Sequence, residues 1–366
     1  MLPFEIASMT DLTPIPIVDI RNGGTLHHAR EGQARALALR DTCLDWFPRL
    51  SRPLLPLLDH YAKQWLMRSR SPYVEEISAI ATALGFPGIW FLNGSYQWCC
   101  TSLAREEDAA PWLVRTLDWP FPGLGRYVEI ARMRGPAGEF FNVTWPGYVG
   151  VLTALAPGRF AAAINQAPLR RRTHGRWLRF FDLGINALDT LLRVRDMPPD
   201  QLLRQVLETC CDYDQARHQL ETTPVARPVI YTLVGCNPGQ RCVIERTERN
   251  AKTRENETSA ANDWLAGTAQ WEARVGGGKL LSSTFEDAAQ NSRTRREALA
   301  RWPGHFARDS FAWIVPPVLN PFTRLAVEMC PATGLLRAVG YELFSGSDLP
   351  QPATLVTNVT ASLVAA

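Results

Sequence analysis

The stretch Asn93-Gly-Ser-Tyr96-Gln-Trp-Cys99-Cys100-Thr-Ser102, followed by Leu113-Val-Arg115-Thr-Leu-Asp118, lies where the texture of this chain changes from helical to strand-like. Before it, leucines and aromatic residues recur at helical spacing. This spacing predicts helices over 31–50, 54–68 and 73–84, after a single strand at 14–20. The third helix carries acidic residues in its first turn and ends at Gly85, as helix signals require.

Beyond Cys100, short β-like segments are separated by turn residues such as Pro122-Gly123 and Pro157-Gly158. Strands in hairpin order around clustered helices predict an α+β fold in which helices pack outside antiparallel sheets. A parallel β/α sheet finds no support, because no glycine-rich phosphate loop follows a strand and Gly276-Gly-Gly-Lys279 is better explained as a turn. The predicted strands cover 100–105, 111–116, 126–133, 139–145, 147–155, 159–165, 228–236, 240–247, 321–330 and 333–344, and the predicted helices 176–193, 199–211, 213–221 and 285–302.

Composition excludes several classes of protein. With 46% hydrophobic and 20% charged residues, the 366-residue chain is neither disordered nor coiled-coil. A net charge of only +3 argues against a nucleic-acid partner, which needs a strong basic excess. The N-terminus lacks a charged region followed by an apolar one, so we expect no secretory signal and a cytoplasmic protein whose cysteines are mostly free thiols. The histidine pair His27-His28 has no ligand partner at suitable spacing, and we expect neither metal nor cofactor.

Cys100 has a specific chemical use if the bond between Cys99 and Cys100 is broken. It would then carry a thiol and a free α-amine, and an α-amine titrates near ~7.7–8.0, so it can accept the thiol's proton near neutral pH. Nucleophile and base would share one residue. Arg115 and Asp118, three residues apart across an expected turn, are placed to orient both groups through charged hydrogen bonds.

These residues resemble a family. Glu75-Glu-Ile-Ser-Ala-Ile-Ala-Thr-Ala-Leu-Gly85, Asn93-x-x-Tyr96, Cys100-Thr-Ser102 and Arg115-x-x-Asp118 are similar to acid ceramidase and the N-acylethanolamine-hydrolysing acid amidase, which group with choloylglycine (bile salt) hydrolase and penicillin V acylase among N-terminal-nucleophile hydrolases. Gly147-Tyr-Val-Gly-Val-Leu-Thr153, Ile164-Asn165-Gln166 and Val234-Gly235 extend the resemblance. It covers roughly residues 14–345.

The resemblance implies a four-layer αββα sandwich made as a precursor that cuts itself between Cys99 and Cys100. Residues 1–99 would form a helical pro-segment that becomes the α chain, and 100–366 the catalytic β chain, with the two remaining associated. Cys100 would be the nucleophile, held by Arg115 and Asp118. Asn165 matches a position that contacts the nucleophile or substrate, Asn262 matches the oxyanion-hole asparagine, and Arg295 lies near the family's late arginine, with Arg293 and Arg296 as rivals.

Three departures from the family pattern bear on chemistry. Thr116 replaces an asparagine beside Arg115. Gln166 stands where the acid amidase has a glutamate linked to acidic pH dependence, so we expect a less acidic optimum. Cys99 places a second thiol before the nucleophile, although the spacing to Thr101-Ser102 favours Cys100 as the first residue of the mature chain.

The implied reaction is hydrolysis of a linear amide through a thioester acyl-enzyme, on an N-acyl amide lipid such as an N-acylethanolamine or a ceramide-like molecule. Trp119 and Phe121 are expected to line the acyl pocket, and Tyr148 and Gln166, which lie in the shared motifs, are counted with the substrate-binding residues. Two alternatives stay open: an acyltransferase resembling isopenicillin N acyltransferase, and an inactive relative that only binds lipids. The aromatic segment Trp177–Leu183 is expected to pack in the core, with weak membrane contact as its alternative role.

Overall fold

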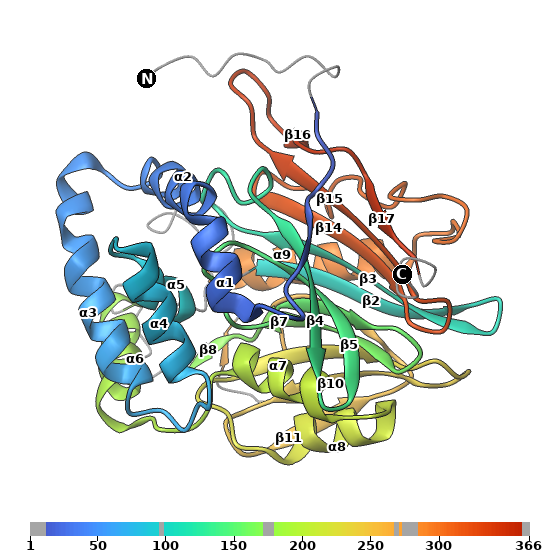
Figure 1. Cartoon of the computed structure of the whole chain (residues 1–366). Helices are drawn as coiled ribbons and strands as arrows, with labels where there is room; N and C mark the ends of the chain where they lie inside the picture. The colour runs from blue at the N-terminus through green and yellow to red at the C-terminus, as the bar shows by residue number, and fades with distance from the viewer. Residues whose placement is uncertain (1–11, 95–98, 171–178, 267–270, 273–284, 361–366) are drawn as a thin grey trace.

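The computed structural model describes residues 12–94, 99–170, 179–266, 271–272 and 285–360 (Figure 1). The chain enters through β1 (Ile17–Asp19) and then forms a helical group that packs beside the sheets. The predicted helix over 31–50 is wrong in its bounds, because Gly32 separates two helices and the first begins at Gly24. The group consists of α1 (Gly24–Glu31), α2 (Gln33–Leu44), the 3-10 helix η2 (Arg49–Leu54), α3 (Leu55–Leu66), α4 (Val74–Leu84) and α5 (Ile89–Gly94).

Two antiparallel sheets follow. The first has eight described strands in the order β1-β4-β5-β6-β7-β9-β10-β11, and only β1 joins it in parallel. Its other strands are β4 (Glu129–Gly135), β5 (Gly138–Thr144), β6 (Thr153–Ala156), β7 (Phe160–Gln166), β9 (Val229–Val234), β10 (Arg241–Arg246) and β11 (Ala251–Arg254).

The second sheet has the order β12-β2-β3-β14-β15-β16, with β17 also paired to β15. It comprises β2 (Cys99–Glu107), β3 (Ala110–Asp118), β12 (Ser259–Ala260), β14 (Thr323–Cys330), β15 (Leu335–Glu342), β16 (Gln351–Pro352) and β17 (Thr357–Val359). Two short strands, β8 (Leu169–Arg170) and β13 (Trp271–Glu272), form a separate pair.

The sheets stack face to face, since β2 contacts β7, β9 and β10 and β3 contacts β7 and β9. Helices α7 (Pro199–Thr209) and α8 (Tyr213–Thr222) cover the outer face of the first sheet, and α9 (Phe285–Ala300) lies against β2 and β12 of the second. The largest apolar core lies between the sheets and under α7 and α8. This order of layers confirms the predicted αββα sandwich.

The predicted strand over 147–155 is mostly wrong. Only Thr153–Ala156 pairs as β6, and residues 147–152 form a loop that begins at Gly147 with φ +84°. The loop passes so close to α7 that a Cβ added at Gly150 would lie 2.0 Å from Asp200 Oδ2, which explains a glycine there. The sequence patterns also did not predict the short elements α5, β11, β12, β16 and β17.

Some expectations fall on other parts of the chain. The predicted helix over 176–193 appears as α6 (Arg179–Arg193), and residues 176–178 lie outside the described residues, as do Tyr96 and the expected turn at Gly276–Lys279. Among the helices that the structure describes, none combines the length and the apolar character that crossing a bilayer demands.

Candidate active site

Cys100 lies near the start of β2, fully buried between the two sheets. Side chains alternate along a strand, so Cys100 and Ser102 point to the inner face and Thr101 to the outer face. The contacts agree: Ser102 Oγ lies 2.8 Å from Thr232 Oγ1 on β9 of the facing sheet, whereas Thr101 Oγ1 accepts a hydrogen bond from Arg295 on α9. Cys100 is therefore held between two layers of side chains.

Arg115 approaches the thiol from the inner face. Its Nη2 donates to Cys100 Sγ at 2.6 Å and to the carbonyl of Ile164 at 3.3 Å, and its Nη1 donates to the carbonyl of Leu152 at 3.2 Å and to Thr153 Oγ1. The expectation that a turn separates Arg115 from Asp118 is wrong, because both lie on β3, where residues three apart point to opposite faces. The two side chains reach the Cys100 region from opposite sides of the sheet.

Asp118 and Arg295 form the outer side of the site. Arg295 Nη1 lies 3.1 Å from Asp118 Oδ2 and donates to the carbonyl oxygen of Cys100 at 2.9 Å. Asp118 Oδ1 accepts from Thr323 Oγ1 at 3.0 Å. Both charged side chains are at most 3% exposed, so this is a buried ion pair fixed by additional hydrogen bonds.

Asn262 lies beside the amide nitrogen of Cys100. Its Oδ1 accepts from the Cys100 N–H at 3.1 Å and from Arg295 Nη2 at 3.0 Å, and its Nδ2 donates to the carbonyl of Gln166 at 2.9 Å. The loop that carries it is anchored on β10, where Glu245 accepts from the backbone N–H groups of Leu265 and Ala266. In the uncut chain, Asn262 thus presents an acceptor to the nitrogen that cleavage would turn into an amine.

The structure separates the three rival arginines of α9. Arg295 reaches Cys100, Thr101, Asp118 and Asn262. Arg296 binds Glu257 at 2.9 Å and Asp263 at 3.4 Å, on the loop that carries Asn262, and Arg293 is exposed.

Asn165 contacts residues close to Cys100, whereas Tyr148 points towards α7. Asn165, at the end of β7, accepts from Ser102 Oγ at 3.2 Å and donates to the carbonyls of Ala260 and Ala261 at 3.1 and 3.2 Å, so it links β2 to the residues before Asn262. The Tyr148 hydroxyl donates to Asp200 Oδ2 at 2.7 Å, which directs the ring towards α7, on the face of the first sheet remote from α9.

Burial shapes the ionisation of the site. Burial raises the pKa of the Cys100 thiol to about 11, against the opposing effect of the Arg115 guanidinium. Burial also raises the pKa of Asp118, an effect opposed by Arg295 and by hydrogen bonds from Asn320 and Thr323. The thiol of the uncut chain is therefore mostly protonated at neutral pH.

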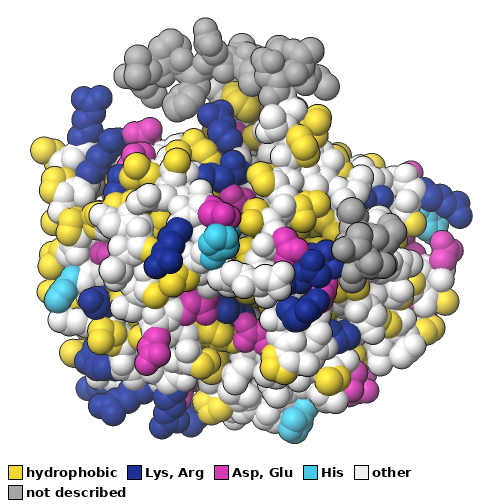
Figure 2. Space-filling view, in the orientation of Figure 1, with side chains coloured by type: hydrophobic (Ala, Val, Ile, Leu, Met, Phe, Trp, Pro, Cys, Tyr) yellow, Lys and Arg dark blue, Asp and Glu magenta, His cyan; other side chains and the backbone are white. Residues whose placement is uncertain are grey.

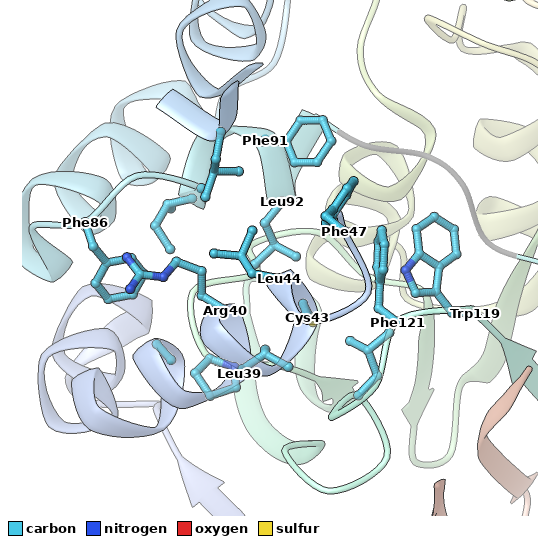
Figure 3. A pocket seen from close by; sticks show the side chains of 16 residues that line it. Leu39, Arg40, Cys43, Leu44, Phe47, Phe86, Phe91, Leu92, Trp119 and Phe121 are labelled. Carbon is cyan, nitrogen blue, oxygen red and sulfur yellow. The ribbon is translucent and has the colours of Figure 1, made fainter. Parts of the chain in front are cut away.

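Trp119 and Phe121, directly after β3, line an apolar pocket with residues of the N-terminal helical group (Figure 3). Phe121 stacks edge-on against Trp119 and Trp46, with ring centroids 5.1 and 5.0 Å apart. About 710 Å³ of space, partly open to solvent, lies between α2, the segment around α5 and the loop after β3. The pocket is lined by Ala36, Leu39, Arg40, Cys43, Leu44, Phe47, Leu55, Phe86, Gly88, Ile89, Phe91, Leu92, Trp119, Phe121, Leu124 and Pro146.

Sequence reasoning missed four residues that fix the charged groups. Thr323 and Asn320 hold Asp118 from the start of β14 and the loop before it, while Thr153 and Thr101 bind the two guanidinium groups. Thr153 ends the motif Gly147–Thr153, which carries part of the family resemblance, and Thr101 is adjacent to Cys100. Thr323 and Asn320 have no signal in the sequence, because only the pairing of β14 with β3 brings them to Asp118.

Comparison with known proteins gives two kinds of match, and no family model matches the chain. The chain is 33% identical over 222 residues to human acid ceramidase and 26% identical over 182 residues to the N-acylethanolamine-hydrolyzing acid amidase of Cavia porcellus. The first match covers 55% of this chain and 54% of the relative, and the second 48% of each, so the chain spans about half the length of the curated relatives it matches.

Among solved structures, the Caenorhabditis elegans ortholog of N-acylethanolamine-hydrolyzing acid amidase is similar with a TM-score of 0.43 at 18% identity, over 64% of this chain and 93% of that one. A conjugated bile acid hydrolase from Clostridium perfringens gives a TM-score of 0.40 at 10% identity, over 72% of this chain and 93% of that one. The αββα arrangement of layers follows from the strand pairing and the sheet and helix contacts of this chain. By sequence, the chain is homologous to acid ceramidase and N-acylethanolamine-hydrolyzing acid amidase.

Proposed function

We propose that this chain is a self-cleaving cysteine amidase that hydrolyses N-acyl amides through a thioester acyl-enzyme. The arrangement around Cys100 is the observation that supports the proposal best. A buried thiol lies 2.6 Å from Arg115 on one side, and Arg295, paired with Asp118, binds the carbonyl of the same residue on the other. Burying charged groups has a large desolvation cost, and here the buried charges converge on the thiol and the carbonyl oxygen of one residue.

The first step is self-cleavage. Cys100 Sγ attacks the carbonyl carbon of Cys99, the C–N bond between the two residues breaks, and the thiol proton passes to the departing nitrogen. Water then hydrolyses the resulting thioester, which frees the carboxylate of Cys99 and restores the thiol. Arg115 stabilises negative charge on the sulfur, since its Nη2 already donates to Sγ in the uncut chain.

Amide turnover uses the new α-amine as the base. Asn262 Oδ1, 3.1 Å from the Cys100 nitrogen in the uncut chain, orients this amine. The amine takes the thiol proton, the thiolate attacks the acyl carbonyl, and the leaving amine departs with that proton. Water then releases the acid and regenerates the thiol.

Asn262 is also our candidate for the oxyanion donor. Its Nδ2 binds the carbonyl of Gln166 in the uncut chain, so the role requires this donor to exchange that carbonyl for the oxygen of the tetrahedral intermediate. A donor of this kind stabilises the transition state by roughly 3–4 kcal/mol.

The substrate class follows from the pocket. Trp119, the residue after Asp118, lines the pocket. The other side chains of the lining are apolar apart from Arg40, and such a lining suits an acyl chain. The homologous proteins are named for N-acylethanolamine and ceramide, and we propose a substrate of that kind, an N-acyl amide with a fatty-acyl chain.

We also propose that the protein takes this substrate from a lipid surface. On α6, four apolar side chains at helical spacing are exposed to solvent. Their exposed fractions range from 39% at Ile185 to 69% at Leu192. Helix α6 contacts α3, and Figure 2 shows apolar side chains along the edge of the molecule where these helices lie in Figure 1, with Lys and Arg below. The exposed residues are Phe181, Ile185, Leu188 and Leu192 on α6, and Leu50, Leu54, Leu57, Leu58 and Tyr61 on η2 and α3.

Intact mass spectrometry tests the proposal. Purified protein incubated between pH 4 and 8 is expected to yield fragments that end at Cys99 and begin at Cys100, and these fragments are expected to be absent from Cys100→Ala. The cleaved protein is then expected to release fatty acid from an N-acylethanolamine. An uncut chain at every pH, together with no acid released, would contradict the proposal. Release of an acyl–amine product when a competing amine is added would instead favour acyl transfer.

A further inference from the structure

The apolar pocket has two distinct ends (Figure 3). At one end lie Trp119 and Phe121, directly after Asp118 in the chain. Trp119 follows the last residue of β3 and packs in the same buried apolar core as Cys100. This is the end from which an acyl group attached to Cys100 would enter.

Arg40 and Phe86 lie at the other end. The Arg40 guanidinium carbon is 4.6 Å from the centroid of the Phe86 ring, and a Cβ added at Gly88 would lie 3.7 Å from Arg40 Cγ. Arg40 is the single charged side chain among the described residues that line the pocket. Its side chain is 24% exposed, so the guanidinium lies between the apolar space and solvent.

The Arg40 guanidinium already forms an ion pair with the carboxylate of Asp41. Asp41 Oδ1 lies 2.6 Å from Arg40 Nη2 and 2.8 Å from Nε, outside the pocket lining. A second carboxylate, from a substrate, would have to compete with this one. The arrangement therefore fits a boundary to the apolar space better than a site for an anionic group.

We infer that Arg40 forms the end wall of the acyl pocket and sets the longest acyl chain that the enzyme accepts efficiently; this inference rests on the proposed amidase function. A methylene that passes the wall must displace the guanidinium from Phe86 or enter solvent, and neither position buries it. Each methylene buried inside the wall contributes ~0.8 kcal/mol, equal to roughly fourfold in kcat/KM. Activity should rise with chain length up to the wall and then stop rising.

The test is a chain-length profile of kcat/KM for saturated N-acylethanolamines. In Arg40→Met, an apolar side chain replaces the wall, and the optimum is expected to move to acyl chains longer by two or more methylenes. The ratio of kcat/KM for chains longer by two methylenes over the wild-type optimum should increase about fifteenfold, fourfold for each methylene. Arg40→Lys keeps a cation at the wall and is expected to retain the wild-type optimum. If Arg40→Met yields too little folded protein, Arg40→Ala gives the same measurement.

Arg134→Met is the matched control, because Arg134 pairs with Glu139 on the first sheet, away from the pocket lining. It is expected to leave the profile unchanged. Folded Arg40→Met and Arg40→Ala with the wild-type optimum would overturn the inference while leaving the amidase proposal intact. If cleaved wild-type protein hydrolyses no member of the series, the amidase proposal itself fails, and the inference fails with it.

Discussion

Asp118 is a carboxylate in a place that disfavours its charge. Burial raises its pKa, and Arg295 and the hydrogen bonds from Asn320 and Thr323 oppose that effect. A carboxyl group with a raised pKa takes up its proton at a higher pH than the ordinary value near ~3.9. Once Asp118 is neutral, its ion pair with Arg295 is lost, and Arg295 is then held at the Cys100 carbonyl by neutral partners such as Thr101 and Asn262. The acid side of the activity profile should therefore be set by Asp118.

We predict a pH optimum above about 5, with activity falling as the pH drops towards the raised pKa of Asp118. Gln166 supplies no carboxylate at the position that the family resemblance links to acidic activity. The measurement is a pH–rate profile of hydrolysis by the cleaved enzyme. Gln166→Glu is the informative variant, because its optimum should move to lower pH. A wild-type maximum below about pH 5 would contradict the prediction.

The residues of the site were predictable to different extents. Cys100, Arg115 and Asp118 lie within one short stretch, so the local pattern was enough to bring them together on β2 and β3. Arg295 was one of three candidates in the sequence, and its helix could be predicted but not which side faces the sheet. Thr323 depends on the pairing of β14 with β3, a long-range register that no local pattern encodes. The roles assigned to these residues stay predictions.

At the scale of elements, most strands were predictable because apolar residues and turn signals recur along the chain. The failure at 147–155 has a physical reason. Its residues are buried and apolar like those of a strand, but the loop over 147–152 packs against α5 and α7 instead of pairing, with Asn93 accepting a hydrogen bond from Val149 N–H and Asp200 from Tyr148. Burial alone does not distinguish a strand from a loop that lies under a helix.

Helix α6 provides a prediction for an element. Three arginines lie near its C-terminal end: Arg193 is its last residue, and Arg70 and Arg249 pair with Asp196 three residues further on. Their side chains are at least 70% exposed. An amphipathic surface with this composition favours anionic bilayers. We predict that the double variant Phe181→Ser, Leu188→Ser binds vesicles of phosphatidylserine and phosphatidylcholine about tenfold more weakly than the wild type, as measured by co-sedimentation.

The control for α6 is Leu343→Ser, which changes another exposed leucine, 42% accessible, just after β15. Both proteins should unfold at nearly the wild-type temperature, because exposed substitutions usually change stability by less than about 0.5 kcal/mol. Hydrolysis of a soluble, short-chain substrate should be unaffected in the double variant. Equal vesicle binding by the wild type and the double variant would show that α6 does not contact lipid.

For the whole molecule, the proposed cleavage divides the chain into two parts that share buried polar contacts. Arg204 on α7 lies 2.8 Å from Glu76 on α4 and 2.8 Å from Glu208, and Glu208 accepts from the Tyr73 hydroxyl at 2.7 Å. A second contact joins His28 on α1 to Glu129 on β4 at 2.9 Å. The pocket draws its lining from both parts as well, so we expect activity to require that the N-terminal part stays bound after cleavage.

We predict that Arg204→Met loosens this association. Removing Arg204 leaves Glu76 and Glu208 as partly buried carboxylates without their shared cation, a change that typically costs about 3–5 kcal/mol for a buried pair. In cleaved protein, native mass spectrometry at increasing urea should then detect release of the N-terminal fragment at a lower concentration than in the wild type. Arg217→Met is the control, because its partners Glu221 and Glu255 lie on the same side of the cleavage site. Coincident release from the wild type and Arg204→Met would mean that apolar packing alone holds the two parts together.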